Sequence, residues 1–352
     1  MKQTRIACEI LPFKFIGLPF LSQAESPVKA EIFDTVIAAE PIERVPPRYP
    51  KHAAMQKQEG WVQVSFVIGD DGKVLDPIVT DSSGITSLEK AALRSVEKWQ
   101  YNPATRDGAA IEQCQTRVQL DFRLDNNKES GVRRKFRTKY MKISTAIAEQ
   151  DFVSAELGLQ EFKEDKLWNR TESALYWLLD ANFANAIKDS HRELASSFRG
   201  VLSGEDALGT QNYQYLQSRL FVLQLKDNQL SAALETYKHL VESKNGAEAA
   251  KPLEAYAAKI KEVLTGEQPI ARTATLLGSR NWTHKLSRDR FTMTNVNGQL
   301  DEMEIRCDNK RSRSTIANDS TWTIPKSWGQ CTVFVKGAKN SSFTLVEESS
   351  QA

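Results

Sequence analysis

Hydrophobic and polar positions alternate along several short stretches in the first third of the chain, as they do in half-buried β-strands. Residues 60–68 alternate in this way, and residues 73–80 and 118–124 repeat the pattern. Residues 69–72 (GDDG) have the composition of a tight hairpin turn, because Asp and Gly tolerate positive φ. Residues 86–96 carry apolar side chains at helical spacing. The pattern predicts a compact domain of mixed helix and sheet.

Strand signals disappear after about Arg133, and apolar residues then recur at helical spacing as far as Gly266. Three segments, beginning at Asp151, Asn182 and Asn228, each place Asp or Asn four residues before an alanine, as in turns between paired helices. Their spacings of 31 and 46 residues lie on either side of the tetratricopeptide period of about 34 without matching it. The region resembles a degenerate array of tetratricopeptide-type repeats, and a plain antiparallel bundle is the alternative.

Beyond Pro269 the alternating pattern returns. Residues 295–298 (NVNG) have the composition of a hairpin turn. Short runs rich in β-branched and aromatic residues occur around it, at 303–307, 322–324, 331–335 and 343–346. The last part of the chain is therefore predicted to be a small all-β module.

The beginning of the chain has the order of a secretory signal peptide. Two basic residues precede a short apolar run at 15–21, and residues 22–24 place small side chains at the −3 and −1 positions of a cleavage site. This interpretation predicts export, with a mature protein that begins near Glu25. An ordinary buried N-terminal segment is the alternative. Residues 25–47 are polar with scattered prolines and are predicted to be a linker.

Composition and charge exclude several functional classes. Of the 352 residues, 40% are hydrophobic and 26% are charged, which is typical of folded multidomain proteins. A formal net charge of +2 provides no overall field for holding nucleic acid. No apolar run approaches the roughly 20 residues that a membrane span requires. The four histidines lack the spacing of metal ligands, and no nucleophile and base are placed together. The sequence therefore predicts no enzyme, no cofactor and no metal.

Five short motifs follow one another in residues 41–124 in the order and at the spacing of the TonB C-terminal domain. They are Arg48-Tyr49-Pro50, the strand sequence from Glu59 to Val67, Asp71-Gly72-Lys73-Val74, the pair of segments 82–84 and 88–93, and residues 99–104 (WQYNPA). In that family the domain is the periplasmic end of an energy transducer that serves outer-membrane receptors. The resemblance implies two helices and a three-stranded antiparallel sheet, whose last strand pairs with a receptor segment called the TonB box.

An edge strand presents unpaired backbone groups that can take an additional strand from a partner. Carried over to this sequence, that edge is Gln115–Arg123. The candidate partner-binding residues are Arg48, Tyr49, Gln115, Arg117, Gln119, Asp121 and Arg123. A large aromatic residue such as Tyr49 is also expected to serve as a core residue of so small a domain.

The partners that the resemblance implies are envelope proteins: a TonB-dependent receptor, a complex of the TonB/ExbB/ExbD type, or another protein of the envelope. The sequence shows neither the N-terminal transmembrane helix nor the long proline-rich spacer of the transducer family. We therefore expect a periplasmic accessory protein of TonB-dependent transport. A periplasmic interaction scaffold unrelated to energised uptake is the alternative.

Export would remove Cys8 and leave three cysteines. Cys307 ends one predicted strand and Cys331 begins another, within a module that buries little apolar surface for its size. We expect a disulfide between these two residues, with Cys114 as a half-buried free thiol. Three free thiols in a cytoplasmic protein are the alternative.

These expectations together describe a multidomain α+β protein. Its predicted parts are a signal peptide at 1–24, a linker at 25–47, a TonB C-terminal-like domain at 48–125, a helical domain at 131–266 and a β module at 270–347.

Overall fold

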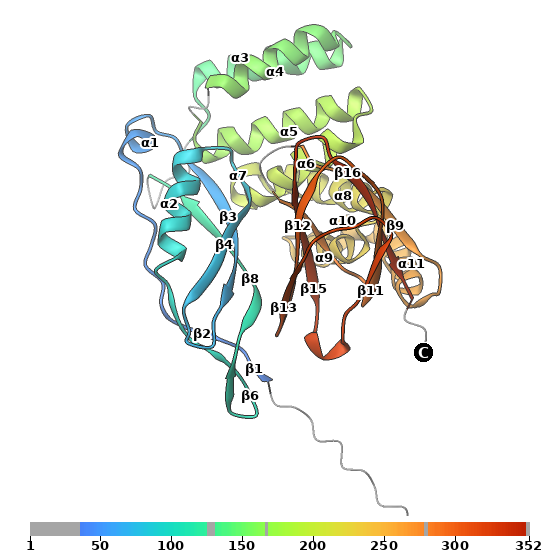
Figure 1. Ribbon diagram of the computed structural model, residues 1–352. Coiled ribbons are helices and arrows are strands. Elements are labelled where there is room, and N and C mark those ends of the chain that lie inside the picture. The colour runs from blue at the N-terminus through green and yellow to red at the C-terminus, as the bar shows by residue number, and fades with distance from the viewer. Residues whose placement is uncertain (1–35, 125–130, 166–167, 278–280, 350–352) are drawn as a thin grey trace, which may run out of the picture. The chain divides into compact units, whose positions relative to one another are not determined.

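The computed structural model of the protein describes residues 36–124, 131–165, 168–277 and 281–349 (Figure 1). The described residues all belong to one compact unit. The predicted signal peptide and the first part of the predicted linker lie outside them.

A three-stranded antiparallel sheet occupies the first part of the chain. Strand β3 (Gly60–Ile68) lies in the centre, between β4 (Val74–Ser82) and β8 (Gln113–Phe122). Helices α1 (Lys51–Met55) and α2 (Thr86–Val96) accompany the sheet. The strands and α2 lie where the alternation and the helical spacing predict them. Helix α2 lies beside the sheet in Figure 1. Every second side chain of β3 packs with α2 in one apolar core.

The turn between β3 and β4 requires glycine at position 72. Gly72 has a φ of +78°, and a Cβ atom there would lie 2.0 Å from the carbonyl oxygen of Tyr101. The amide of Tyr101 also donates to the carbonyl of Gly72 at 2.9 Å. The turn is thereby held against the short strand that contains Tyr101.

Short strands surround this sheet. They are β1 (Val36–Ile37), β2 (Glu40–Glu43), β5 (Gln100–Asn102), β6 (Ala104–Arg106) and β7 (Ala109–Ile111). Strand β2 pairs with β5, and β1 pairs with β6. The described part of the predicted linker therefore contains two strands. Their side chains are exposed, and their backbone pairs with the domain.

The two edges of the three-stranded sheet differ. Strand β4 contains Pro77, its Asp76 has a φ of +46°, and its pairing with β3 shifts register twice. Proline and bulges are features that stop an edge strand from pairing with another chain. Strand β8 is ten residues long, has neither proline nor glycine, and shifts register once, near its start. The sheet therefore has one irregular edge, β4, and one regular edge, β8.

The face of β3 that points away from α2 is buried as well. Trp61 is 1% exposed, and Ser65 and Val67 are buried beside it. The indole N–H of Trp61 donates to the hydroxyl of Ser203 at 3.3 Å, which joins the sheet to the helical region. A sheet covered on only one side would leave these residues in water. Both faces of this sheet are covered.

Helices fill the middle of the chain. They are α3 (Arg134–Ala148), α4 (Phe152–Asp165), α5 (Arg170–Ala186), α6 (Ser190–Leu202), α7 (Glu205–Leu208), α8 (Thr210–Lys226), α9 (Leu230–Glu242), α10 (Gly246–Ala250) and α11 (Glu254–Thr265). A single 3₁₀ turn, η1 (Lys251–Leu253), precedes α11.

One of the three predicted helix–helix turns is wrong. The segments that begin at Asp151 and Asn228 lie between helices, whereas Asn182 lies inside α5. Asn169 begins α5 with a capping box, and the side chain of Asn182 accepts a hydrogen bond from Tyr215 at 3.1 Å. A partner on a neighbouring helix lets asparagine stay inside a helix, so its presence did not mark a turn. The resemblance to tetratricopeptide repeats stays a prediction.

The last part of the chain contains two four-stranded antiparallel sheets that share one apolar core. Their orders are β10-β15-β12-β13 and β14-β11-β16-β9. The strands are β9 (Ile270–Thr275), β10 (Trp282–Lys285), β11 (Arg290–Asn297), β12 (Leu300–Cys307), β13 (Arg311–Ser314), β14 (Ser320–Thr323), β15 (Cys331–Gly337) and β16 (Ser342–Glu348), with a 3₁₀ turn, η2 (Lys326–Trp328). We call residues 270–348 the β module.

The hairpin predicted at residues 295–298 is wrong, although a turn is present there. Asn295 and Gly298 both have positive φ, as such turns require. Strands β11 and β12, which the turn connects, pair with different neighbours in different sheets. Turn residues specify that the chain reverses, but the buried faces of the strands decide with which strand each one pairs.

Candidate functional site

Strand β8, the regular edge of the sheet, is the candidate site. Of the described strands, only β3 pairs with it. Its Val118 and Leu120 pack against the α2 core. Because side chains alternate along a strand, Gln115, Arg117, Gln119 and Asp121 point to the opposite face. Most of the predicted partner-binding residues therefore lie on one face of this strand.

The first half of β8 touches the β module. The amide of Cys114 donates to the carbonyl oxygen of Asp308 at 3.1 Å. The side-chain amide of Gln115 donates to the carbonyl of Gln330 at 2.9 Å, and the hydroxyl of Thr332 donates to Gln115 Oε1 at 2.7 Å. Both the backbone and one predicted partner-binding side chain are thus already engaged within the chain.

The second half of β8 touches the helical region. Gln119 Nε2 donates to the carbonyl of Leu202, at the end of α6, at 2.9 Å. Just beyond the strand, Arg123 forms ion pairs with Asp121 at 3.4 Å and with Asp206 of α7 at 3.5 Å. Arg117 is opposite Ser65 in the pairing, and its side chain is exposed.

Arg48 and Tyr49 lie near the end of β8. The ring of Tyr49 packs edge-on against that of Phe122, the last residue of the strand, with 5.7 Å between centroids. Burial, together with the charge of Glu59, raises the pKa of the Tyr49 hydroxyl. Tyr49 is therefore partly buried and packs against the core of the domain, whereas Arg48 beside it is exposed.

Asp76, which sequence analysis missed, connects the start of β4 to the β module. Its carboxylate forms ion pairs with Arg311 and, at 2.8 Å, with Arg313, while its carbonyl oxygen accepts from Arg306 at 3.1 Å. Burial opposes ionisation of Asp76, but the hydrogen bond from Arg311 and the nearby arginine charges outweigh it and hold the pKa of Asp76 below its usual range. Arg311 also pairs with Glu112 at 3.2 Å.

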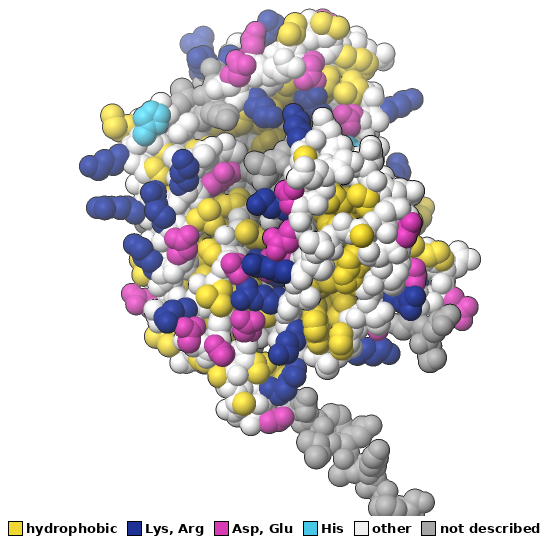
Figure 2. Space-filling model, viewed as in Figure 1, with side chains coloured by type: hydrophobic (Ala, Val, Ile, Leu, Met, Phe, Trp, Pro, Cys, Tyr) yellow, Lys and Arg dark blue, Asp and Glu magenta, His cyan; other side chains and the backbone are white. Residues whose placement is uncertain are grey.

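Charged side chains of both signs gather between β8 and the β12–β13 pair in Figure 2. The basic residues among them include Arg311 and Arg313 of β13. The structure gives them acidic partners inside the same chain, more than 190 residues away in sequence. No local sequence pattern signals a contact across that separation.

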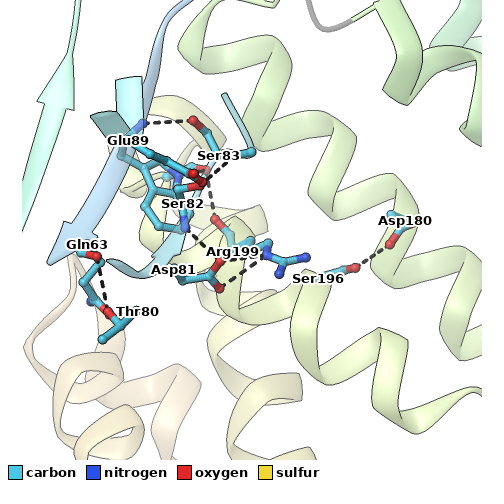
Figure 3. A network of polar contacts seen from close by, with 12 residues as sticks. Gln63, Thr80, Asp81, Ser82, Ser83, Glu89, Asp180, Ser196 and Arg199 are labelled. Carbon is cyan, nitrogen blue, oxygen red and sulfur yellow. Dashed lines mark hydrogen bonds and ion pairs between the residues drawn. The ribbon is translucent and has the colours of Figure 1, made fainter. Parts of the chain in front are cut away.

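A second polar connection joins the end of β4 to helix α6 (Figure 3). Arg199 Nε lies 3.2 Å from the carboxylate of Asp81, and the Arg199 guanidinium lies 4.9 Å from the centre of the Trp177 ring. The pair is partly buried, so solvent screens it less than a surface pair.

We expect Arg199→Ala to lower the free energy of unfolding by about 1–2 kcal/mol, because it removes a partly buried ion pair and a cation–π contact. Chemical denaturation followed by circular dichroism measures the effect. Arg134→Ala, at an exposed position of α3, is the control and should change stability by less than about 0.5 kcal/mol. An equal loss in both variants would contradict the assigned role of Arg199.

The cysteines pair as predicted. Cys307 and Cys331 form a disulfide between β12 and β15, at positions that face each other in the pairing. Cys114 is the free cysteine of the described residues and is buried. Burial, with a smaller contribution from Glu112, raises the pKa of its thiol to about 12, so the thiol stays protonated and unreactive at neutral pH.

The described ranges show neither a metal-ligand cluster nor a membrane-spanning helix. Across 36–124, 131–165, 168–277 and 281–349, no three His, Cys, Asp or Glu side chains gather as a metal site. In the same ranges no helix combines the length and the apolar character that crossing a membrane requires.

Comparison with known proteins identifies the class of the first domain. Residues 45–124 match the family described as the Gram-negative bacterial TonB protein C-terminal, so this part of the chain is a TonB C-terminal domain. The match covers the sheet, α1 and α2, and it includes β8. It ends before α3, and the helical region and the β module lie outside it.

Individual relatives agree with this assignment. Protein TonB of Haemophilus influenzae is 47% identical over 49 residues, which are 14% of this chain and 18% of that protein. Protein TonB of Vibrio cholerae is 27% identical over 82 residues, 23% of this chain and 33% of that protein. This chain therefore spans a third or less of either relative.

Among solved structures, the solution NMR structure of the Pseudomonas aeruginosa TonB C-terminal domain has 23% sequence identity and a TM-score of 0.22. It covers 26% of this chain and 90% of that chain.

Proposed function

We propose that this protein binds an extended segment of an envelope partner along β8 and serves TonB-dependent outer-membrane transport as an accessory protein. One observation carries the proposal: the part of the chain that matches the TonB family has a long, regular edge strand with no second strand paired to it among the described residues. Such an edge binds a partner through backbone hydrogen bonds, and neighbouring side chains select its sequence. The role is one of binding, without catalysis.

The proposed location is the periplasm, after removal of residues 1–24. The Cys307–Cys331 disulfide supports it, because structural disulfides form in oxidising compartments. The proposed partner is a TonB-dependent receptor that offers its TonB box. Arg48 precedes Tyr49, whose ring packs on Phe122 at the end of β8, and its proposed role is to contact the end of such a segment.

Proline substitution tests strand addition directly. Consecutive N–H groups of a strand point in opposite directions, so one of Gln119→Pro and Val118→Pro removes a donor facing the partner and the other removes a donor facing β3. We expect the variant that loses the donor facing the partner to stay folded and to bind the partner at least about tenfold more weakly. It lacks one backbone hydrogen bond to the partner, and the proline ring blocks another. The other should lose β structure.

The measurement is isothermal titration with synthetic TonB-box peptides from the receptors of the same organism, and circular dichroism confirms folding. Gln119→Ala is the matched control, since it removes the side-chain contact to Leu202 but keeps the backbone donor. A folded proline variant that keeps full peptide affinity, or peptides that bind none of the proteins, would contradict the proposal.

A second candidate function is a periplasmic scaffold, in which the TonB C-terminal domain connects the chain's own parts. The contacts of Gln115 and Gln119 with the β module and α6 favour it, because they use predicted partner-binding residues internally. Binding of envelope proteins through the helical region, unaffected by either proline variant, would support this candidate.

A further inference from the structure

One sheet of the β module has a buried outer face, and two residues of that face contact the TonB C-terminal domain. In β12, Met303 and Ile305 point into the module's own core, so Glu304 and Arg306 point outward. In β15, Thr332 and Phe334 point outward for the same reason. All four outward side chains are nevertheless buried, Arg306 at 1% and Phe334 at 3% exposure.

This contact contains ion pairs and hydrogen bonds and lies between two separate apolar cores. Among the described residues, the apolar core of the TonB C-terminal domain and that of the β module share no side chain. Ion pairs and hydrogen bonds connect the two parts, and they are centred on Asp76, Glu112, Cys114 and Gln115. Interfaces of this kind open without unfolding either partner. The module can therefore leave the sheet while both cores stay intact.

The closed arrangement also has an energetic cost. The guanidinium of Arg306 is buried, and its Nε and Nη1 atoms have no hydrogen-bond partner among the described residues. Its Nη2 atom donates to Asp76 and to Glu304. Burying charged donors without partners opposes docking, because water would satisfy them in the open state. The cost offsets part of the attraction between the arginines and Asp76.

The position of the contact coincides with the binding edge. The carbonyl of Asp308 accepts from the backbone amide of Cys114, in the first half of β8, where an added strand would pair. Gln330 holds the side chain of the next residue, Gln115, on the face of the sheet. We infer that the β module is a cover in cis: docking of the module and addition of a partner strand to the first half of β8 exclude each other. The inference rests on the proposed function and states how the same site is regulated.

The test weakens the contact by substitutions in the β module. Arg311→Glu with Arg313→Glu replaces the attraction to Asp76 and Glu112 by repulsion and touches neither β8 nor either core. Lys336→Glu with Lys339→Glu is the matched control, because it changes the charge of the same module equally at exposed positions. Both variants are made in the full chain, and circular dichroism confirms their folding.

Two readouts are needed. The first is hydrogen exchange of the Cys114 amide, measured by NMR, since this amide donates to Asp308 across the contact. The second is affinity for a synthetic TonB-box peptide. We expect faster exchange and at least about tenfold tighter binding in the arginine double variant, because apparent affinity scales with the open fraction. The lysine control should match the wild type in both.

The outcomes separate the two ideas. Peptide binding of equal affinity in wild type and arginine variant overturns the cover while leaving the proposed function intact. Unchanged exchange at Cys114 in the folded arginine variant overturns the cover as well. Faster exchange without peptide binding in any protein supports the movable module and contradicts the proposed function.

Discussion

Replacing Cys307 and Cys331 together by alanine is expected to lower the free energy of unfolding of the β module by about 3 kcal/mol, because their disulfide closes a loop of 24 residues that would otherwise add entropy to the unfolded chain. The β module buries its core between only two small sheets, so the total stability of the module is small. A loss of about 3 kcal/mol is a large fraction of it. Urea denaturation followed by tryptophan fluorescence measures it, since three tryptophans lie in the module.

The control is Cys114→Ala, which removes a buried thiol without breaking a bond and should cost no more than about 1 kcal/mol. Adding a reductant should bring the wild type to the stability of the double variant and leave that variant unchanged. Equal stability of the oxidised wild type and the double variant would contradict the stapling role of the disulfide.

Replacing Gly72 by alanine is expected to lower the free energy of unfolding by about 3 kcal/mol or more. Part of this cost is the strain of a non-glycine residue at positive φ, roughly 1–2 kcal/mol. The rest is steric, since the new Cβ would lie 2.0 Å from the carbonyl oxygen of Tyr101 and the backbone must move apart. Thermal and urea denaturation of the purified protein measure the sum.

Gly108→Ala separates the two causes. Gly108 has a φ of +82°, but a Cβ there meets nothing within 4 Å, so the substitution adds strain alone. The difference between the two variants is the steric cost at Gly72. Similar losses of stability in Gly72→Ala and Gly108→Ala would show that the backbone around Gly72 moves away from Tyr101 at no energetic cost. The close approach of Gly72 to Tyr101 would then be unimportant for stability.

Local patterns predicted most elements of the first domain. The alternation around Val62 and Val64 and the turn at Gly72 depend on neighbours in sequence, and the structure confirms both. The disulfide was predictable for a similar reason, because each cysteine sits at the end of a strand of one small module. Such features follow from chemistry within a few residues.

Long-range contacts were not predictable in this way. The burial of Trp61 and Val67 on the second face of β3 was visible only as apolar residues that broke the alternation. The partners of Arg311 lie more than 190 residues earlier, and no pattern connects them. The hairpin expected at Asn295 failed because the pairing of its strands depends on the two-sheet core, which is a property of the whole module.

At high protein concentration the two edges of the three-stranded sheet differ in their tendency to pair with a second molecule. Pro77 and the left-handed Asp76 prevent β4 from acting as a template for a second molecule. Strand β8 has neither proline nor a left-handed residue, and contacts from the β module and α6 shield it. When β8 is uncovered in two molecules, the two strands can pair with each other. Antiparallel β8–β8 pairing would join the two sheets into one. The shielding therefore also keeps the protein from self-association and aggregation.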